Sequence, residues 1–209
     1  MDKEAVIIGL TGQTGAGKTT AANELKSKDC LIIDAVLDAG GCEVGLESTV
    51  ITLASRVPTL LRPGGVTAEE LRGVLGNVEV DKAVTEKINL LETVASPGMK
   101  YKHYSPKTKV IIVDGSSEEF IGFVNSNADS KAAALCYTED EPMLNVKTVT
   151  FGEKDNYSMQ ANELFSALRK IDALNVDVVY ARCPQKEGVG LAVYNRLIRA
   201  AGFEVIKLG

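Results

Sequence analysis

The sequence has no tryptophan, a single histidine and four cysteines among 209 residues. Cys30, Cys42, Cys136 and Cys183 lie far apart and form no CxxC pair. Because a structural zinc site needs about four closely spaced Cys or His ligands, the sequence argues against a zinc centre. Cys136 and Cys183 fall in apolar runs, where a free thiol is usually a small buried side chain. Free thiols fit a reducing compartment such as the cytoplasm.

Long apolar runs and long basic runs are also absent. The apolar run at residues 5–10 is too short for a signal-peptide core or a membrane span. The net charge of −5, without a basic run, argues against a general nucleic-acid binder or a membrane-surface binder. We therefore expect a cytoplasmic, soluble protein with small-molecule ligands, and the sequence does not indicate its oligomeric state. A length of 209 residues permits one large domain or two small ones, and the 45% hydrophobic content is typical of a globular chain.

A glycine-rich stretch, GQTGAGKTT at residues 12–20, matches the pattern of a phosphate-binding P-loop. It lies between a predicted strand at 5–10 and a predicted helix at 18–28, and a second strand is predicted at 30–33. Backbone N–H groups of such a loop surround phosphates, the lysine reaches the outer phosphates and the threonine holds Mg²⁺. The candidate phosphate-binding residues are Gly12, Gly15, Gly17, Lys18 and Thr19, and Thr19 is also the candidate metal ligand. An inherited but idle loop is the alternative.

The next segment predicts a short sheet followed by a linker. Residues 48–53 and 58–61 are predicted strands that lead into a Pro-Gly-Gly turn. Thr67 and Glu70 form a capping box that opens a short helix, and Gly76 closes it. Residues 81–107 show little strand signal and predict a helical piece and then a long linker.

The last hundred residues alternate regularly between apolar strands and helices. Strands are predicted at 110–113, 132–137, 176–181 and 203–208. One helix begins with a capping box at Ser116 and Glu119, and the helix at 157–174 has apolar residues at helical spacing. This alternation predicts a Rossmann-like, three-layer α/β domain with a mostly parallel sheet. Asp114, at the end of the first of these strands, is either a second magnesium ligand or an ordinary strand-end residue.

The opening IIGLTGQTGAGKTT…LIIDA resembles the start of dephospho-coenzyme A kinases over about the first 35 residues. Asp34 and Ala35 match the Asp-Ala-Asp motif of that family, but Val36 replaces its second aspartate. The coenzyme-binding region and the arginine-bearing lid of such a kinase have no counterpart here. This resemblance implies a P-loop phosphotransferase as an alternative function.

Three later stretches, CEVGLESTVI, LLRPGGVTAEEL and SPGMKYKHYSPK, resemble long-form L-threonylcarbamoyl-adenylate synthases, the YrdC-like family. The C-terminal stretch DVVYARCPQKEGVGLAVYNRLIRAAGF resembles the end of that family's accessory domain. The family joins L-threonine, bicarbonate and ATP into threonylcarbamoyl-adenylate for a tRNA adenosine, releasing pyrophosphate. The resemblance implies these small molecules as ligands, with Mg²⁺ beside ATP and no tightly bound cofactor.

Carried over residue by residue, Ser48 of the EST stretch would contact L-threonine and Arg62 of LRPG would contact ATP. A hydroxyl can hydrogen-bond an amino acid, and a guanidinium can pair with phosphate. The family's interdomain linker folds over the active site, and its polar and aromatic members here would be Lys100, Tyr101, His103 and Tyr104. The resemblance assigns no catalytic residue.

The chain departs from this family before residue 48. The family's Lys-x-Arg motif, which holds phosphates, and its Ser-x-Asn loop, which helps bind the nucleotide, are absent from the sequence. We therefore expect a truncated or hybrid threonylcarbamoyl-AMP synthase that is catalytically incomplete alone, or a non-catalytic ligand-binding module. The expected parts are a P-loop β-α-β unit (1–35), a partial YrdC-like α+β segment (36–80), a linker (81–108) and the Rossmann-like domain (109–209).

Overall fold

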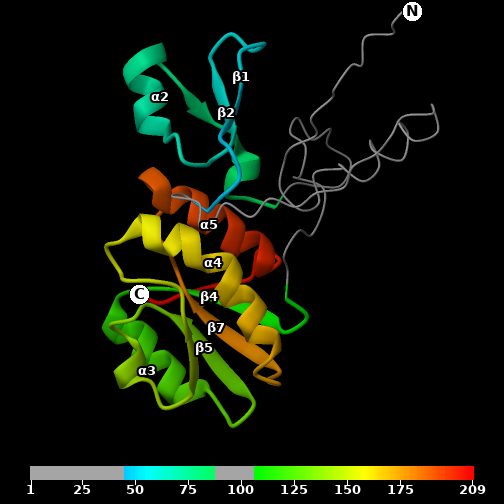
Figure 1. Ribbon diagram of the computed structural model, residues 1–209, viewed down its shortest axis with the longest axis vertical. Helices are drawn as coiled ribbons and strands as arrows, with labels where there is room; N and C mark the ends of the chain where they lie inside the picture. The colour runs from blue at the N-terminus through cyan, green and yellow to red at the C-terminus, as the bar shows by residue number, and fades with distance from the viewer. Residues whose placement is uncertain (1–44, 88–105) are drawn as a thin grey trace, which may run out of the picture. The chain divides into compact units, whose positions relative to one another are not determined.

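The computed structural model describes residues 45–87 and 106–209, which belong to one compact unit, Gly41–Gly209. These residues form a three-stranded sheet and a five-stranded sheet (Figure 1). Within the described ranges, no helix is both long enough and apolar enough to cross a membrane. The expected domain boundaries stay predictions.

The smaller sheet contains the two strands that were predicted upstream of the Pro-Gly-Gly turn. Its strands lie in the order β1-β2-β3, and their bounds are β1 (Val50–Thr52), β2 (Thr59–Arg62) and β3 (Glu79–Val80). β1 is antiparallel to β2, and β3 is parallel to β2. A register shift at Val50 and Ile51 leaves Val50 opposite Arg62.

One α-helix follows this hairpin, α2 (Ala68–Leu75), and its ends confirm the capping prediction. The Thr67 hydroxyl accepts a hydrogen bond from the Glu70 N–H, and the Glu70 carboxylate accepts one from the Thr67 N–H. Gly76 ends the helix with a positive φ of 82°, which glycine adopts without steric cost. After β3, the helical piece predicted from residue 81 is the 3-10 helix η1 (Lys82–Val84).

The larger sheet confirms the predicted α/β fold. Its strands lie in the order β6-β5-β7-β4-β8 and every pair is parallel. Their bounds are β4 (Lys109–Asp114), β5 (Ala132–Cys136), β6 (Lys147–Thr150), β7 (Val178–Arg182) and β8 (Val205–Lys207). A short 3-10 helix, η2 (Glu141–Met143), connects β5 with β6.

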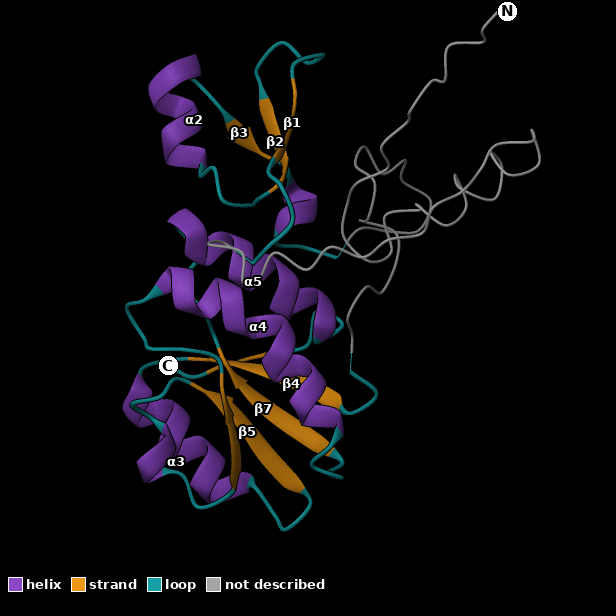
Figure 2. Ribbon diagram, in the orientation of Figure 1, coloured by secondary structure: helices purple, strands orange, loops and turns teal. Residues whose placement is uncertain are grey.

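Helices cover both faces of this sheet and make the predicted three layers (Figure 2). On one face α3 (Ser117–Asn127) packs Phe120 and Val124 against β4 and β5. On the other face lie α4 (Tyr157–Asp172) and α5 (Gly188–Ala200), which enclose the main apolar core. Alternate residues of a strand point to opposite faces, so Ile112 and Val113 of β4 belong to different cores.

Two cysteines lie in the described ranges. Cys136 is buried in β5, as predicted. Cys183 is only partly buried, because it lies one residue beyond the end of β7 rather than inside the strand. That position brings its thiol to the carboxyl edge of the sheet.

Candidate functional site

The β1–β2 hairpin brings the two predicted ligand-contacting residues together. Ser48 precedes β1 and Arg62 ends β2, and the antiparallel pairing folds these positions onto each other. Arg62 Nε donates a hydrogen bond of 3.0 Å to the backbone carbonyl of Ser48. The EST and LRPG stretches, fourteen residues apart, therefore build one local site.

Gly64 fits this site because it has no side chain. A Cβ at Gly64 would lie 2.5 Å from the Glu47 carbonyl oxygen and 2.5 Å from the Thr49 nitrogen. In addition, the Thr49 hydroxyl donates a hydrogen bond of 2.7 Å to the Val66 carbonyl. It also accepts one of 3.1 Å from the Val66 N–H. The turn after β2 is thus held against the backbone on both sides of Ser48.

The side-chain groups with which Ser48 and Arg62 are predicted to contact ligands have no hydrogen-bond partner among the described residues. Ser48 is exposed, and its hydroxyl forms no hydrogen bond with any described residue. Arg62 uses Nε to hold the Ser48 carbonyl, and its two terminal nitrogens have no hydrogen-bond partner among the described residues. A residue with an unoccupied hydroxyl and a residue with an oriented guanidinium are therefore joined through the Ser48 carbonyl.

Glu47 connects this site to α5, a contact that the sequence did not predict. Its carboxylate accepts a 2.6 Å hydrogen bond from Arg196 Nε. Burial alone would raise the pKa of Glu47, but the charge and hydrogen bond of Arg196 outweigh it, and the pKa lies below its usual value. Burial lowers the pKa of the Arg196 guanidinium.

The same helix also holds η1. Asn195 donates a 2.6 Å hydrogen bond to the Val84 carbonyl and accepts one of 2.7 Å from Arg196. Arg199 donates a hydrogen bond of 2.8 Å to the Ala83 carbonyl. The stretch YNRLIRAAGF, singled out as a family resemblance, therefore contributes polar side chains that contact the Glu47 carboxylate, next to Ser48, and the backbone of η1.

Two groups of predicted residues lie outside the described residues. They are the P-loop positions Gly12, Gly15, Gly17, Lys18 and Thr19, and the linker positions Lys100, Tyr101, His103 and Tyr104. Their roles stay predictions.

Asp114 lies at the end of β4, where the sequence placed it, and binds Lys186 with a distance of 2.7 Å between Oδ2 and Nζ. No cluster of three or more His, Cys, Asp or Glu side chains occurs within residues 45–87 and 106–209. A role for Asp114 with magnesium stays a prediction.

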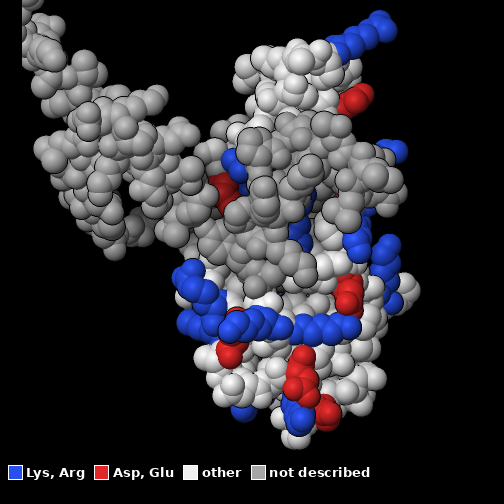
Figure 3. Space-filling model, turned by 90° about the vertical axis from the view of Figure 1, so that its right-hand side faces the viewer, with Lys and Arg blue, Asp and Glu red and all other residues white. Residues whose placement is uncertain are grey.

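Basic side chains form a row on the face of the molecule shown in Figure 3, and acidic side chains lie beside them. The larger sheet also carries two exposed ion pairs, Lys109–Glu204 at 2.8 Å and Lys131–Asp177 at 3.4 Å. Neighbouring charges of opposite sign weaken the field that such a row would produce alone.

Comparison with known proteins identifies similar chains. The family model of the threonylcarbamoyl-AMP synthase C-terminal domain matches residues 66–202. Threonylcarbamoyl-AMP synthase of Pyrococcus abyssi is 35% identical over 205 residues, covering 93% of this chain and 57% of the relative. The Bacillus subtilis protein of the same name is 35% identical over 178 residues, covering 84% of this chain and 51% of the relative.

A solved structure agrees with these matches. The crystal structure of P. abyssi Sua5 complexed with L-threonine has a TM-score of 0.67 and 35% identity, covering 85% of this chain and 52% of that one. The chain thus spans about half the length of these relatives.

The match to the P. abyssi synthase includes part of the first 35 residues. That match covers 93% of the chain, so similarity to this group extends upstream of residue 36. The resemblance of those residues to a kinase stays a prediction.

Proposed function

Because the chain belongs to the threonylcarbamoyl-AMP synthase family, we propose that residues 45–87 form part of a site for L-threonine and ATP. The family reaction joins L-threonine, bicarbonate and ATP into threonylcarbamoyl-adenylate and releases pyrophosphate, as one step of a tRNA modification. The observation that carries this proposal is the hydrogen bond between Arg62 and the Ser48 carbonyl. It brings together the two residues that the family resemblance assigns to the two substrates.

Each side chain suits its assigned substrate. The exposed Ser48 hydroxyl can donate to the carboxylate of L-threonine or accept from its ammonium group. Arg62 can direct its terminal nitrogens at phosphate oxygens as a charge-assisted pair, while its Nε remains on the Ser48 carbonyl. Both ligands would then lie next to each other, as a reaction between the carbamate of L-threonine and the α-phosphate of ATP requires.

We propose further that the chain alone is catalytically incomplete. The phosphate-holding Lys-x-Arg motif and the Ser-x-Asn loop of the family are absent from its sequence. Arg62 would be left as the main cation on the nucleotide, and too little charge would be neutralised in the transition state. The linker residues Lys100, Tyr101, His103 and Tyr104 would close over the site and exclude water from the labile carbamate.

Binding of L-threonine, measured by isothermal titration calorimetry, tests the role of Ser48. Ser48→Ala is expected to weaken binding about tenfold to a hundredfold, because one hydrogen bond to a charged group is lost. Ser55→Ala makes the same chemical change in the turn at the far end of the hairpin and should bind L-threonine as the unaltered chain does. Equal weakening in both variants, or none in Ser48→Ala, would contradict the assignment.

Binding of ATP with Mg²⁺ separates the hairpin from the P-loop. Arg62→Gln should weaken ATP binding about tenfold through loss of a charged pair, whereas Arg56→Gln, in the exposed β1–β2 turn, should not. Lys18→Ala tests the alternative phosphotransferase. A loss of ATP binding in Lys18→Ala alone would assign the nucleotide to the P-loop and contradict the role proposed for Arg62.

A further inference from the structure

A small polar pocket lies at the carboxyl edge of the five-stranded sheet, apart from the hairpin. Its volume is about 160 Å³, and its lining includes Asp114 and Tyr137 from the ends of β4 and β5, and Arg182 and Lys186 from the end of β7 and the loop after it. A water molecule needs roughly 10–15 Å³ of such volume, so the pocket has room for an anion of phosphate size with a few waters. It is too small to enclose a whole nucleotide.

The topology of the sheet places this pocket where α/β domains bind ligands. From β4 the chain passes through α3 to β5, which lies beyond β7, and from β7 it passes through α5 to β8, which lies beyond β4. The two adjacent strands therefore send their connections in opposite directions. A crevice opens at the carboxyl ends of such a strand pair and is the usual ligand site of open parallel sheets.

Arg182 is the buried cation of the pocket. It is 4% exposed, its NH1 donates to the Gly115 carbonyl, and its guanidinium lies 5.5 Å from the Phe120 ring centroid. Nε lies 3.5 Å from Asp140 Oδ2 but makes no hydrogen bond. Asp140 is thus the buried ion-pair partner of Arg182, and the missing hydrogen bond at Nε leaves the guanidinium able to attract a further anion.

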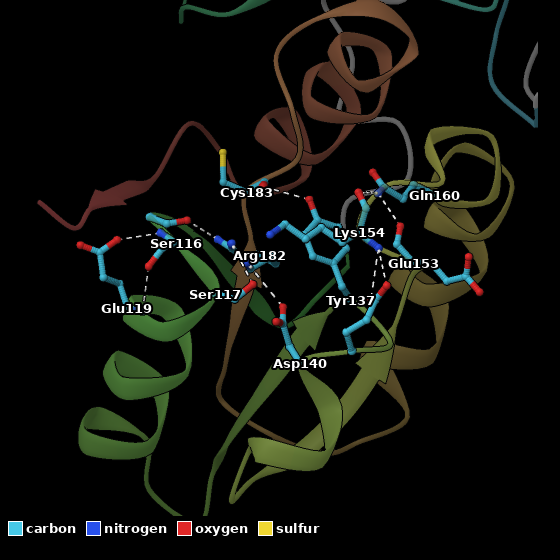
Figure 4. Close-up of polar contacts among 12 residues, drawn as sticks. Ser116, Ser117, Glu119, Tyr137, Asp140, Glu153, Lys154, Gln160, Arg182 and Cys183 are labelled. Carbon is cyan, nitrogen blue, oxygen red and sulfur yellow. Dashed lines mark hydrogen bonds and ion pairs between the residues drawn. The ribbon is translucent and has the colours of Figure 1, made fainter.

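Lys154 is the available cation. Its side chain points toward Arg182 across Tyr137 (Figure 4), and Nζ has no partner among the described residues. Its backbone N–H donates to the Glu139 carboxylate at 3.1 Å, which holds the start of the side chain in place. The Tyr137 hydroxyl donates a hydrogen bond of 3.2 Å to the Cys183 carbonyl. This bond holds the tyrosine ring in place between Lys154 and Arg182.

The third cation, Lys186, is held by the carboxylate of the pocket. Its Nζ lies 2.7 Å from Asp114 Oδ2 and 5.1 Å from the Tyr194 ring centroid. Burial would raise the pKa of Asp114, but the hydrogen bond from Lys186 outweighs it and the pKa is lowered. The lining thus has three cations and one carboxylate, and a second carboxylate, Asp140, pairs with Arg182 behind it.

We propose that this pocket binds a small phosphate-like oxyanion, either free or as the terminal group of a larger molecule. Lys154 provides its direct cationic contact and Arg182 the charge behind it. Asp114 opposes the anion and occupies Lys186, so this carboxylate limits the affinity. The site is independent of the hairpin and does not require the proposed synthase activity.

Calorimetric titration of the full chain with inorganic phosphate tests this site. The background is the double variant Lys18→Ala/Arg62→Gln, because it removes the P-loop and hairpin cations. Saturable binding is expected, and Lys154→Ala should weaken it about tenfold through loss of a charged hydrogen bond. Lys131→Ala is the matched control, since this exposed lysine precedes β5 at the opposite edge of the sheet and pairs with Asp177.

Asp114→Asn supplies a result that a purely structural role would not give. It removes the opposing charge and releases Lys186, so phosphate should bind more tightly by about fivefold or more. Parallel titrations with pyrophosphate and AMP identify the source of the anion, since tighter binding of either one indicates a larger molecule. Absence of binding for all three anions would overturn the proposal, as would equal effects of Lys154→Ala and Lys131→Ala or weaker binding in Asp114→Asn. Circular dichroism verifies that each variant is folded.

Discussion

At the scale of single residues, the hairpin site depends on a glycine as much as on its polar side chains. The Pro-Gly-Gly turn passes so close to the backbone around Ser48 that only hydrogen fits at the Gly64 α-carbon. The atoms in the way belong to the backbone of Glu47 and Thr49, which cannot rotate aside as a side chain would.

Gly64→Ala should therefore destabilise the chain by roughly 1–3 kcal/mol, the usual cost of overpacking. Gly73→Ala is the matched control, because Gly73 lies on α2 and a Cβ there meets no atom within 4 Å. That change should stabilise by about 0.5–1 kcal/mol through helix propensity. Urea unfolding followed by circular dichroism measures both, and equal stability of the two variants would contradict the close approach.

Burial also makes the Cys183 thiol difficult to ionise. Burial, reinforced by the charge of Asp114, raises the pKa of its thiol to about 12. Because the thiolate is the reactive form and its fraction at neutral pH falls about tenfold for each unit of pKa, iodoacetamide should alkylate Cys183 about a thousandfold more slowly than a free cysteine. Asp114→Asn should speed the reaction, whereas Asp177→Asn, which changes an exposed carboxylate elsewhere, should not. Peptide mass spectrometry reads the rate at each cysteine, and rapid labelling of Cys183 would contradict the pKa shift.

At the scale of elements, α5 connects the larger sheet to the segment that carries Ser48. The link is the Arg196–Glu47 ion pair, in which the Arg196 side chain is 6% exposed and the Glu47 side chain 25%. Removing one partner of such a pair leaves a buried charge without its counter-ion.

Glu47→Gln should destabilise the chain by roughly 1–3 kcal/mol at neutral pH. Because folding lowers the pKa of Glu47, the unfolded chain binds its proton more readily, and the stability that Glu47 contributes disappears as pH falls below about 4. The unaltered chain should therefore lose its advantage over Glu47→Gln in acid. Glu204→Gln, at an exposed pair, should cost about 0–1 kcal/mol. A pH-independent difference between the unaltered chain and Glu47→Gln would contradict the pairing.

Local signals in the sequence predicted elements better than they predicted contacts. Both capping boxes, at Thr67 and at Ser116, correctly located the start of a helix because all their hydrogen bonds form within three residues. The four-residue strand β6 was missed because a run that short, with two threonines and a lysine, has weak apolar periodicity. The contact between Glu47 and Arg196 joins residues 149 positions apart and follows only from the tertiary fold.

At the scale of the whole molecule, the alternation of apolar strands and amphipathic helices was enough to predict the parallel sheet and its two helical layers. Strand order was not predictable, because the sequence does not state which strands are neighbours. That order creates the crevice between β4 and β7 where Asp114, Lys154, Arg182 and Lys186 meet. The family resemblance assigned Ser48 and Arg62, and the hairpin brings them together, but it gave no indication of this second site.

Pyrophosphate release from ATP by the purified, folded chain, with and without L-threonine and bicarbonate, would show whether the hairpin belongs to a complete synthase site. The hairpin offers Ser48 and Arg62, but the sequence has no Lys-x-Arg motif to hold the phosphates. We therefore expect no pyrophosphate release that depends on both L-threonine and bicarbonate, even where L-threonine binds. Release that requires both substrates and is lost in Arg62→Gln would show a complete synthase site and contradict the account.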